Sequence, residues 1–170
     1  SLTQLAEVLE IVKEISMDHG CREFRTGLGR DERDHLLKAR HELGEMIFRN
    51  HPDCSPLSLD VAVPISAYPE IVAMAGEEKE RSRIPAYLFS HAGDGNIHFI
   101  LAGKKDDKED WDLIEEVNRR VVKKALGLGG TSTGEHGVGI GKRQFMRQEH
   151  GKSLDWMKRI KSLFDPKGIL

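Results

Sequence analysis

The chain has 170 residues, of which 38% are hydrophobic and 32% are charged, and this length allows one sizeable buried core. Its 26 lysines and arginines nearly balance its 28 aspartates and glutamates, which argues against the basic surface of a nucleic-acid-binding domain. The sequence contains neither an apolar run of transmembrane length nor a signal-peptide pattern, and Cys21 and Cys54 form no CxxC pair or disulfide framework. We therefore expect one domain over residues 1–170, with no transmembrane segment and no nucleic-acid partner.

The N-terminal part of the chain predicts two long helices and two strands. Apolar residues repeat every three or four positions over residues 2–19 and again over residues 31–50, which is the period of an amphipathic helix. Between these helices, residues 21–25 are expected to form a short strand. A continuous apolar run at residues 59–63 predicts a buried strand, which Pro64 ends.

Arg40 has an unusual position in the second predicted helix. It follows Leu36 by four residues and precedes Leu43 by three, so the helical period places it on the apolar face. A buried guanidinium needs an anionic partner, because an uncompensated buried charge is costly. Two interpretations stay open. In the structural one, Arg40 forms a salt bridge or extends to the edge of the core; in the functional one, it is a clamp for a substrate carboxylate.

The rest of the chain predicts further helices and an antiparallel hairpin. The dipeptide Pro69-Glu70 is expected to start a helix, since proline favours the first helical turn. Residues 85–90 and 96–102 predict two strands, residues 107–126 predict a long amphipathic helix, and residues 153–164 predict a final helix. This succession predicts an α+β fold, and we expect a ferredoxin-like antiparallel sheet with helices packed on one face.

The segment between the two hairpin strands contains a pair of histidines. Asp94-Gly95 is a strong signal for a two-residue turn, which would place His91 directly opposite His98, with Cβ atoms about 4.5–5.5 Å apart. Asn96 would point to the same face, because side chains alternate along a strand. Two imidazoles at this separation can share one metal ion. The alternative is a hairpin whose histidines are only half-buried polar residues.

A second motif lies at residues 127–141, where seven of fifteen residues are glycine. Its glycine spacing matches neither a phosphate-binding P-loop nor a dinucleotide fingerprint. It contains Glu135, followed by His136. Glu135 together with His91 and His98 makes a two-histidine, one-carboxylate set, which is the ligand count of a catalytic zinc site and which Mn²⁺ or Fe²⁺ would also accept. The alternative is a flexible connector with an incidental acidic residue.

These motifs together resemble a known family. The resemblance rests on residues 91–98 and 134–139, on the closing residues 164–170, and on the supporting stretches 38–41 and 60–66. In this order they are similar to the C-terminal, substrate-binding domain of FAD-linked oxidases. More narrowly, they resemble the D-lactate dehydrogenase and D-2-hydroxyacid dehydrogenase branch of the vanillyl-alcohol oxidase superfamily.

The resemblance implies roles for six side chains as metal ligands, as a catalytic base and as substrate contacts. The metal ligands would be His91, His98 and Glu135, the catalytic base would be His136, and the substrate contacts would be Arg40 and Asn96. The implied metal is zinc or manganese, and the implied reaction oxidises a D-2-hydroxy acid to a 2-oxo acid with hydride transfer to FAD. The FAD-binding domain would lie earlier in the same full-length chain, so we expect this fragment to be inactive by itself.

Two departures from the family pattern bear on the substrate. Relatives that favour the diacid D-2-hydroxyglutarate tend to carry a lysine where this chain has Ser58, which favours a monoacid such as D-lactate. Many relatives have an arginine where Ala67 stands. We expect a location in the cytoplasm, or at the periphery of a membrane on its cytoplasmic side.

Two other classes of function stay open at this point. The same two histidines and glutamate would serve a self-sufficient metal-dependent hydrolase, and the chain could equally be a non-catalytic α+β interaction module. The interaction module would leave His91 and His98 on opposite faces of the sheet and would bind no divalent metal.

Overall fold

A computed structural model describes residues 1–169, and of Ala39 it describes the backbone alone. Leu170, which ends the closing motif of the family resemblance, lies outside the described residues. The chain divides into two compact units, one of residues 1–47 and one that begins at Phe48. Each unit is described separately.

The first unit contains α1, Leu2–Asp18, and most of α2, Gly29–Asn50. Both predicted helices are confirmed. A capping box closes the start of α1, where the Ser1 hydroxyl accepts a hydrogen bond from the Gln4 N–H. The strand predicted at residues 21–25 is wrong, because residues 21–28 form no regular structure. An isolated strand has no neighbour to satisfy its backbone groups, and within the described residues no strand pairs with this segment.

Arg40 is exposed, so its predicted burial is wrong. Its neighbour on the same helical stripe, Leu36, is 42% exposed, and of the stripe only Ile47 is buried. The apolar spacing is present, but the stripe is not covered at Arg40, and its guanidinium therefore keeps its hydration. The structural salt bridge was expected only because Arg40 was predicted to be buried, so its exposure removes the reason for that interpretation. The predicted substrate contact is not tested by this exposure and stays a prediction.

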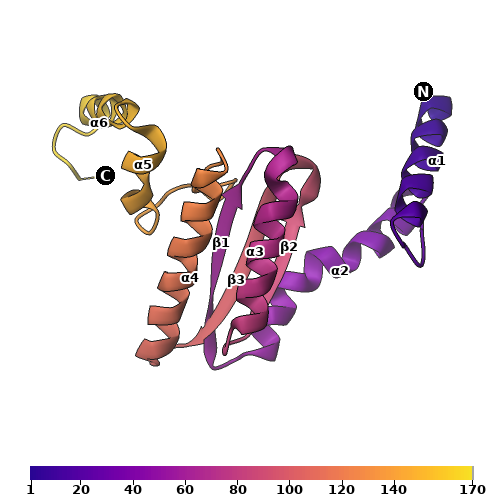
Figure 1. Ribbon diagram of the computed structural model, residues 1–170, viewed down its shortest axis with the longest axis horizontal. Helices are drawn as coiled ribbons and strands as arrows, with labels where there is room; N and C mark the ends of the chain where they lie inside the picture. The colour runs from indigo at the N-terminus through magenta and orange to yellow at the C-terminus, as the bar shows by residue number, and fades with distance from the viewer. Residues whose placement is uncertain (170) are drawn as a thin grey trace. The chain divides into compact units, whose positions relative to one another are not determined.

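The second unit is built on a three-stranded antiparallel sheet with the order β1-β3-β2 (Figure 1). The strands are β1, Cys54–Ala62, β2, Ala86–His91, and β3, Asn96–Lys104. The predicted α+β sheet is confirmed, although β1 begins earlier than expected because its first residues pair with the end of β3. Beyond residue 127 the chain returns to the free edge of β1, where Thr131 forms an isolated bridge with Ala62. This return is where a ferredoxin-like layout has its fourth strand.

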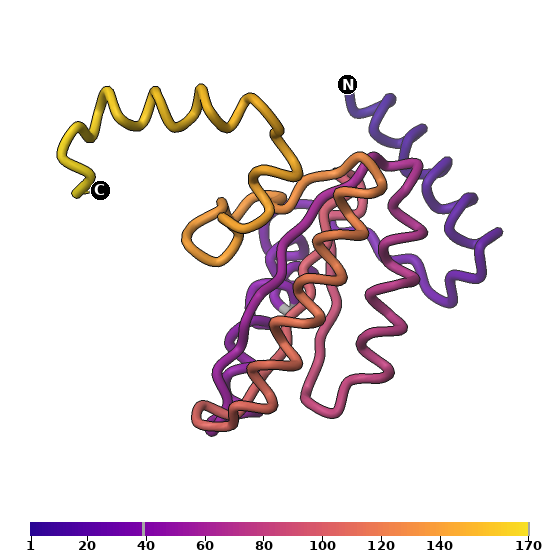
Figure 2. The backbone as a smooth tube through the Cα atoms, turned by 60° about the vertical axis from the view of Figure 1, so that its left-hand side comes forward, coloured from indigo at the N-terminus to yellow at the C-terminus, as the bar shows by residue number. Residues whose placement is uncertain are grey.

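Helices α3, Tyr68–Arg81, and α4, Lys108–Gly127, pack on one face of this sheet, and α4 runs alongside it (Figures 1 and 2). Both helices begin as predicted, α3 with proline in its first turn and α4 with the Asp107 side chain accepting from the first backbone N–H groups. Alternate residues of the strands face the helices and form the core. Its fully buried members include Val61, Phe99 and Leu101 from the strands and Ile71 and Val121 from the helices.

The other set of alternating residues faces away from α3 and α4. On β1 and β3 this set includes Asp60, Asn96 and His98, all of which are buried, and on β2 it includes Phe89 and His91. A buried polar cluster on a sheet face is unusual, because polar groups are costly to bury unless they find partners. The period of two therefore separates the apolar face under α3 and α4 from a second face, which we name the polar face after its buried polar cluster, although it also carries Phe89.

The chain ends with α5, Met146–His150, and α6, Ser153–Phe164. The predicted bounds of α6 are confirmed, but its apolar residues are not buried, and Trp156 is 64% exposed. Within the described part of the chain, none of the helices combines the length and the hydropathy needed to cross a membrane.

Candidate active site

The hairpin between β2 and β3 turns differently from the prediction. Residues Ala92–Asp94 form a turn of 3-10 helix and Gly95 follows with φ 71°, so His91 pairs with Asn96 instead of His98. The predicted two-residue turn is therefore wrong. The reason is that Gly95 packs on the end of β1, where its carbonyl accepts the Val63 N–H at 3.0 Å. A Cβ at Gly95 would lie 2.0 Å from the Val63 oxygen, so this close contact needs glycine.

The two histidines nevertheless lie on one face of the sheet. The pairing partner of His91 moves by two residues, from His98 to Asn96, and a shift of two preserves the face. The imidazole rings of His91 and His98 meet edge to face with centroids 5.2 Å apart. The predicted common face of His91, Asn96 and His98 is confirmed, and an arrangement on opposite faces is ruled out for these residues.

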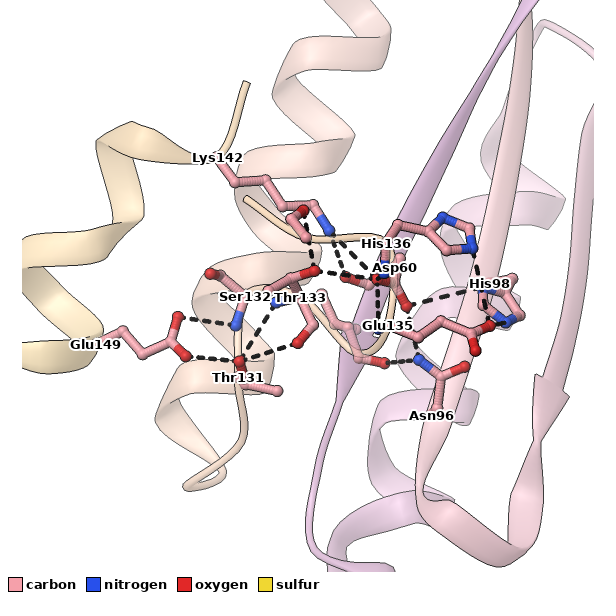
Figure 3. A network of polar contacts seen from close by, with 12 residues as sticks. Asp60, Asn96, His98, Thr131, Ser132, Thr133, Glu135, His136, Lys142 and Glu149 are labelled. Carbon is pink, nitrogen blue, oxygen red and sulfur yellow. Dashed lines mark hydrogen bonds and ion pairs between the residues drawn. The ribbon is translucent and has the colours of Figure 1, made fainter. Parts of the chain in front are cut away.

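The glycine-rich segment brings Glu135 and His136 to this face (Figure 3). Glu135 Oε1 lies 3.0 Å from His98 Nε2 and 3.4 Å from His91 Nε2. The ring of His136 stacks on that of His98, with centroids 5.1 Å apart and an interplanar angle of 18°. Residues from β2, from β3 and from a distant loop thus meet at one point.

The side chains of His91, His98 and Glu135 make a donor set that could hold a metal ion. One ligand atom each from His91, His98 and Glu135 lies within 4.8 Å of the others. Burial is the main reason that the pKa of His98 lies below its usual value, although the nearby Asp60 charge opposes this shift. A lowered pKa keeps the imidazole neutral, which is the form that binds metal. Because Glu135 and His91 are only partly covered, one side of the set stays open to a small ligand.

Asp60 is a central residue of the site that the sequence did not single out by itself. Its carboxylate is fully buried and accepts hydrogen bonds from the Asn96 amide at 2.7 Å, the Glu135 N–H at 2.9 Å and the His136 N–H at 2.8 Å. Burial by itself would raise the pKa of Asp60, but these donors and the Lys142 ammonium together hold it well below its usual range. The signal in the sequence was an acidic residue inside the apolar run at residues 59–63.

Asn96 is buried within the same network. Its amide group donates to Asp60 Oδ1 at 2.7 Å and to the Val61 carbonyl at 3.2 Å, so both amide hydrogens have partners inside the protein. Its Oδ1 atom is buried and has no hydrogen-bond partner among the described residues. The predicted contact of Asn96 with substrate stays a prediction, and the amide oxygen is the atom left to make it.

Two further charged residues anchor the glycine-rich segment. The Lys142 ammonium donates to the Asp60 carbonyl at 2.6 Å, and burial is the main reason that the pKa of Lys142 is lowered. Glu149 accepts from the Ser132 N–H at 3.0 Å and from the Thr131 hydroxyl at 2.5 Å. These contacts fix the segment on both sides of Glu135. Neither residue carried a recognisable sequence signal, since each is one of many charged residues.

The structure thus brings together five of the six predicted site residues, namely His91, Asn96, His98, Glu135 and His136. Arg40 belongs to the unit of residues 1–47 and is not placed with them.

Residues 2–170 match the family of FAD linked oxidases, C-terminal domain, and the chain belongs to this family. The resemblance stated from the motifs is therefore confirmed. A probable mitochondrial D-lactate dehydrogenase of Danio rerio is 32% identical over 171 residues, which cover 100% of this chain and 34% of the relative. A mitochondrial D-lactate dehydrogenase (cytochrome) of Kluyveromyces lactis is 33% identical over 98% of this chain and 29% of the relative.

A third relative has a different named substrate. The D-2-hydroxyglutarate dehydrogenase of Stutzerimonas stutzeri is 32% identical over 138 residues, which cover 79% of this chain and 29% of the relative. The chain spans about a third of the length of the curated relatives it matches.

Proposed function

We propose that residues 1–170 are the substrate- and metal-binding domain of an FAD-dependent D-2-hydroxyacid dehydrogenase. The reaction oxidises a D-2-hydroxy acid such as D-lactate to the 2-oxo acid and transfers a hydride to FAD. The observation that carries the proposal is the meeting of His91, His98 and Glu135 on one face of the sheet, with His136 stacked beside them. Relatives named D-lactate dehydrogenase support the reaction class.

His91, His98 and Glu135 are the residues that would hold a divalent metal, zinc or manganese. A bound metal supplies Lewis acidity at the substrate hydroxyl and a fixed point for its carboxylate. FAD, which a flavin-binding domain of the same full-length chain would hold, supplies the electron acceptor. The contribution of this chain is to orient the hydroxy acid and to remove a proton.

His136 is the proposed base for that proton. Its ring is half exposed, and its Nε2 atom lies 3.8 Å from Glu135 Oε1, on the open side of the donor set. The hydroxyl proton of the substrate transfers to the His136 imidazole as the Cα hydrogen leaves. A histidine suits this step because its usual pKa lies near neutral pH.

The proposed substrate is a short monoacid. Ser58 lies two residues before Asp60 on β1 and therefore on the same polar face, so a neutral side chain stands where a lysine would bind a second carboxylate. The matched relatives include both D-lactate and D-2-hydroxyglutarate dehydrogenases, so this choice is part of the proposal. We also propose a location in the cytoplasm or at the periphery of a membrane on its cytoplasmic side, although two relatives carry mitochondrial names.

The first experiment measures Zn²⁺ binding to this chain by calorimetry, with His98→Ala as the variant. We expect one-to-one binding that the variant loses, since His98 is the most buried donor. His19→Ala, which changes an exposed histidine at the end of α1, is the matched control and should bind like the original chain. Equal binding by all three proteins would show that the ion sits elsewhere.

The second experiment tests the base in a protein that carries both this domain and a flavin-binding domain. His136→Ala should lower the turnover number roughly 10²- to 10⁴-fold, because general acid–base catalysis contributes about that much. Normal turnover in this variant would exclude His136 as the base. Chelator-sensitive esterase activity of the chain alone would instead favour the metal-dependent hydrolase, and the same-face histidines already weaken the case for a non-catalytic module.

A further inference from the structure

We infer that Asp60 is a positioning residue that holds Glu135 and His136 over the histidines of the hairpin. The inference deepens the proposed function and rests on it for the roles of Glu135 and His136. It assigns to Asp60 no contact with substrate or metal. Its role is to determine where the glycine-rich segment lies relative to β3.

The place of Asp60 in the sheet is the first observation. It lies in β1 directly opposite His98 in β3, and none of its surface is exposed. A buried carboxylate inside a strand is unfavourable unless its oxygens accept hydrogen bonds. This site therefore needs donors for both oxygens, and the chain provides them from two separate segments.

The second observation is the set of donors around Oδ2. The backbone N–H groups of Glu135 and His136 reach this atom at 2.9 Å and 2.8 Å, and the Thr133 hydroxyl lies 3.1 Å from it (Figure 3). Two successive N–H groups that share one acceptor fix the orientation of their peptide units. The directions of the Glu135 and His136 side chains follow from that orientation.

The third observation is the surroundings of Oδ1. This oxygen accepts from the Asn96 amide at 2.7 Å and lies 3.8 Å from His98 Nδ1, a buried nitrogen with no hydrogen-bond partner in the described part of the chain. In metal sites the outer nitrogen of a ligating histidine usually faces a carboxylate or a carbonyl. One carboxylate thus lies between the hairpin half and the loop half of the site.

Gly134 provides independent evidence that the loop is fitted to Asp60. A Cβ at Gly134 would lie 1.9 Å from Asn96 Nδ2 and 2.6 Å from Asp60 Oδ1. The loop can approach the pair of Asp60 and Asn96 only because this residue has no side chain. Lys142 then balances the buried charge, with its ammonium 3.7 Å from Asp60 Oδ2.

The test compares Asp60→Asn with Asp110→Asn in this chain. Asp110 is a matched control because it is also a buried aspartate that accepts a backbone N–H, from Lys104 at 3.0 Å, and pairs with Arg83 at 2.9 Å. It lies at the start of α4 and is not part of the site. Both variants lose the charge of a buried carboxylate, so a general loss of stability affects both.

Two quantities are measured for each variant. Amide hydrogen exchange at Glu135 and His136 should be faster in Asp60→Asn than in Asp110→Asn, because only the first loses its charged acceptor. The affinity for Zn²⁺ alone should fall roughly 10- to 100-fold in Asp60→Asn and stay unchanged in Asp110→Asn, the effect typical of residues that support metal ligands. Gly134→Ala separates the loop from an intact Asp60 and should reproduce both effects if Asp60→Asn does not fold.

The outcomes separate this inference from the proposed function. Faster exchange at Glu135 and His136 in a chain that binds no Zn²⁺ would support the positioning role and refute the metal site. Unchanged exchange and unchanged affinity in Asp60→Asn or Gly134→Ala would overturn the positioning role and leave the metal site intact. Equal losses in Asp60→Asn and Asp110→Asn would also overturn it, by reducing Asp60 to a structural residue.

Discussion

The two faces of the sheet differ in the buried side chains that they carry, although these side chains alternate along the same strands. On one face, residues such as Phe99 and Leu101 are fully buried under α3 and α4. On the other face, Asp60, Asn96 and His98 are also buried but are polar. Burial of the apolar side chains stabilises the fold. Burial of the polar side chains offsets part of that stabilisation, because these groups lose their hydration.

This contrast separates stability from chemistry within neighbouring residues. His98 and Phe99 are consecutive in β3, yet one contacts Glu135 and the other packs in the core. A substitution on one face should therefore change a different measured quantity from a substitution on the other.

The largest effect is expected for Phe99→Ala. Removing this fully buried ring should lower the free energy of unfolding by about 3–5 kcal/mol, because the transfer free energy is lost and a cavity remains. Zn²⁺ affinity of the molecules that stay folded should not change. Urea unfolding checks the loss of stability, and Zn²⁺ titration checks the unchanged affinity. His98→Ala should show the reverse pattern, with a loss of Zn²⁺ affinity and a smaller change in the free energy of unfolding. Loss of Zn²⁺ binding in fully folded Phe99→Ala would mean that the two faces are not independent.

A smaller effect is expected for the ion pair that joins the two covering helices. Glu78 in α3 is buried, and both of its oxygens accept hydrogen bonds from Arg120 in α4, at 2.8 Å and 2.7 Å. Arg120→Ala should lower the free energy of unfolding by about 1–3 kcal/mol, since it leaves a buried carboxylate with fewer donors. Arg119→Ala removes an exposed pair with Glu115 and should cost at most ~0.5 kcal/mol.

The same pair predicts how stability depends on pH. Hydrogen bonds from Arg120 are the main reason that the pKa of Glu78 lies below its usual value of 4.5, and they outweigh the opposing effect of burial. A group with a lowered pKa in the folded state stabilises the protein above its unfolded pKa. This stabilisation is lost as the pH falls below 4.5 toward the folded pKa.

Unfolding curves between neutral and acidic pH check this dependence. Glu78→Gln should remove part of the loss of stability in acid. Glu116→Gln is the matched control, because Glu116 also pairs with Arg120 but is exposed, and it should leave the pH dependence nearly unchanged. An identical acid response in the original chain and in Glu78→Gln would show that other carboxylates cause it.

Local signals predicted the helices and the approximate position of the hairpin strands. The helix at residues 107–126 was predictable because Asp107 is a good N-cap and the apolar spacing after it continues for several turns. The strand predicted at residues 21–25 failed because propensity does not supply a pairing partner. The burial of Arg40 failed because an apolar stripe on a helix does not by itself show that anything covers it.

The sequence predicted that His91, His98 and Glu135 would come together, but not the network that supports them. His91, His98 and Glu135 belong to short motifs that are recognisable from residue types alone. The turn depends on Gly95 packing against Val63, and this contact joins parts of the chain that no local spacing relates. The role of Asp60 likewise depends on donors from β3 and from the glycine-rich segment. Such networks follow from tertiary structure, so sequence patterns do not reveal them.

The smallest effect is expected for a change of substrate preference on the polar face. Ser58→Lys, made in a protein that also carries a flavin-binding domain, adds a positive charge two residues from Asp60 on the same side of β1. A partly exposed ion pair is worth up to about 1 kcal/mol, so the ratio of kcat/KM for D-2-hydroxyglutarate over D-lactate should rise about fivefold.

The control is Ser55→Lys, which lies on the opposite side of the strand and should leave this ratio unchanged. A fall in kcat/KM for both substrates with no change in their ratio would mean that residue 58 supports the sheet without facing the second carboxylate. A shift in the ratio alone would show that a side chain on the polar face selects the substrate.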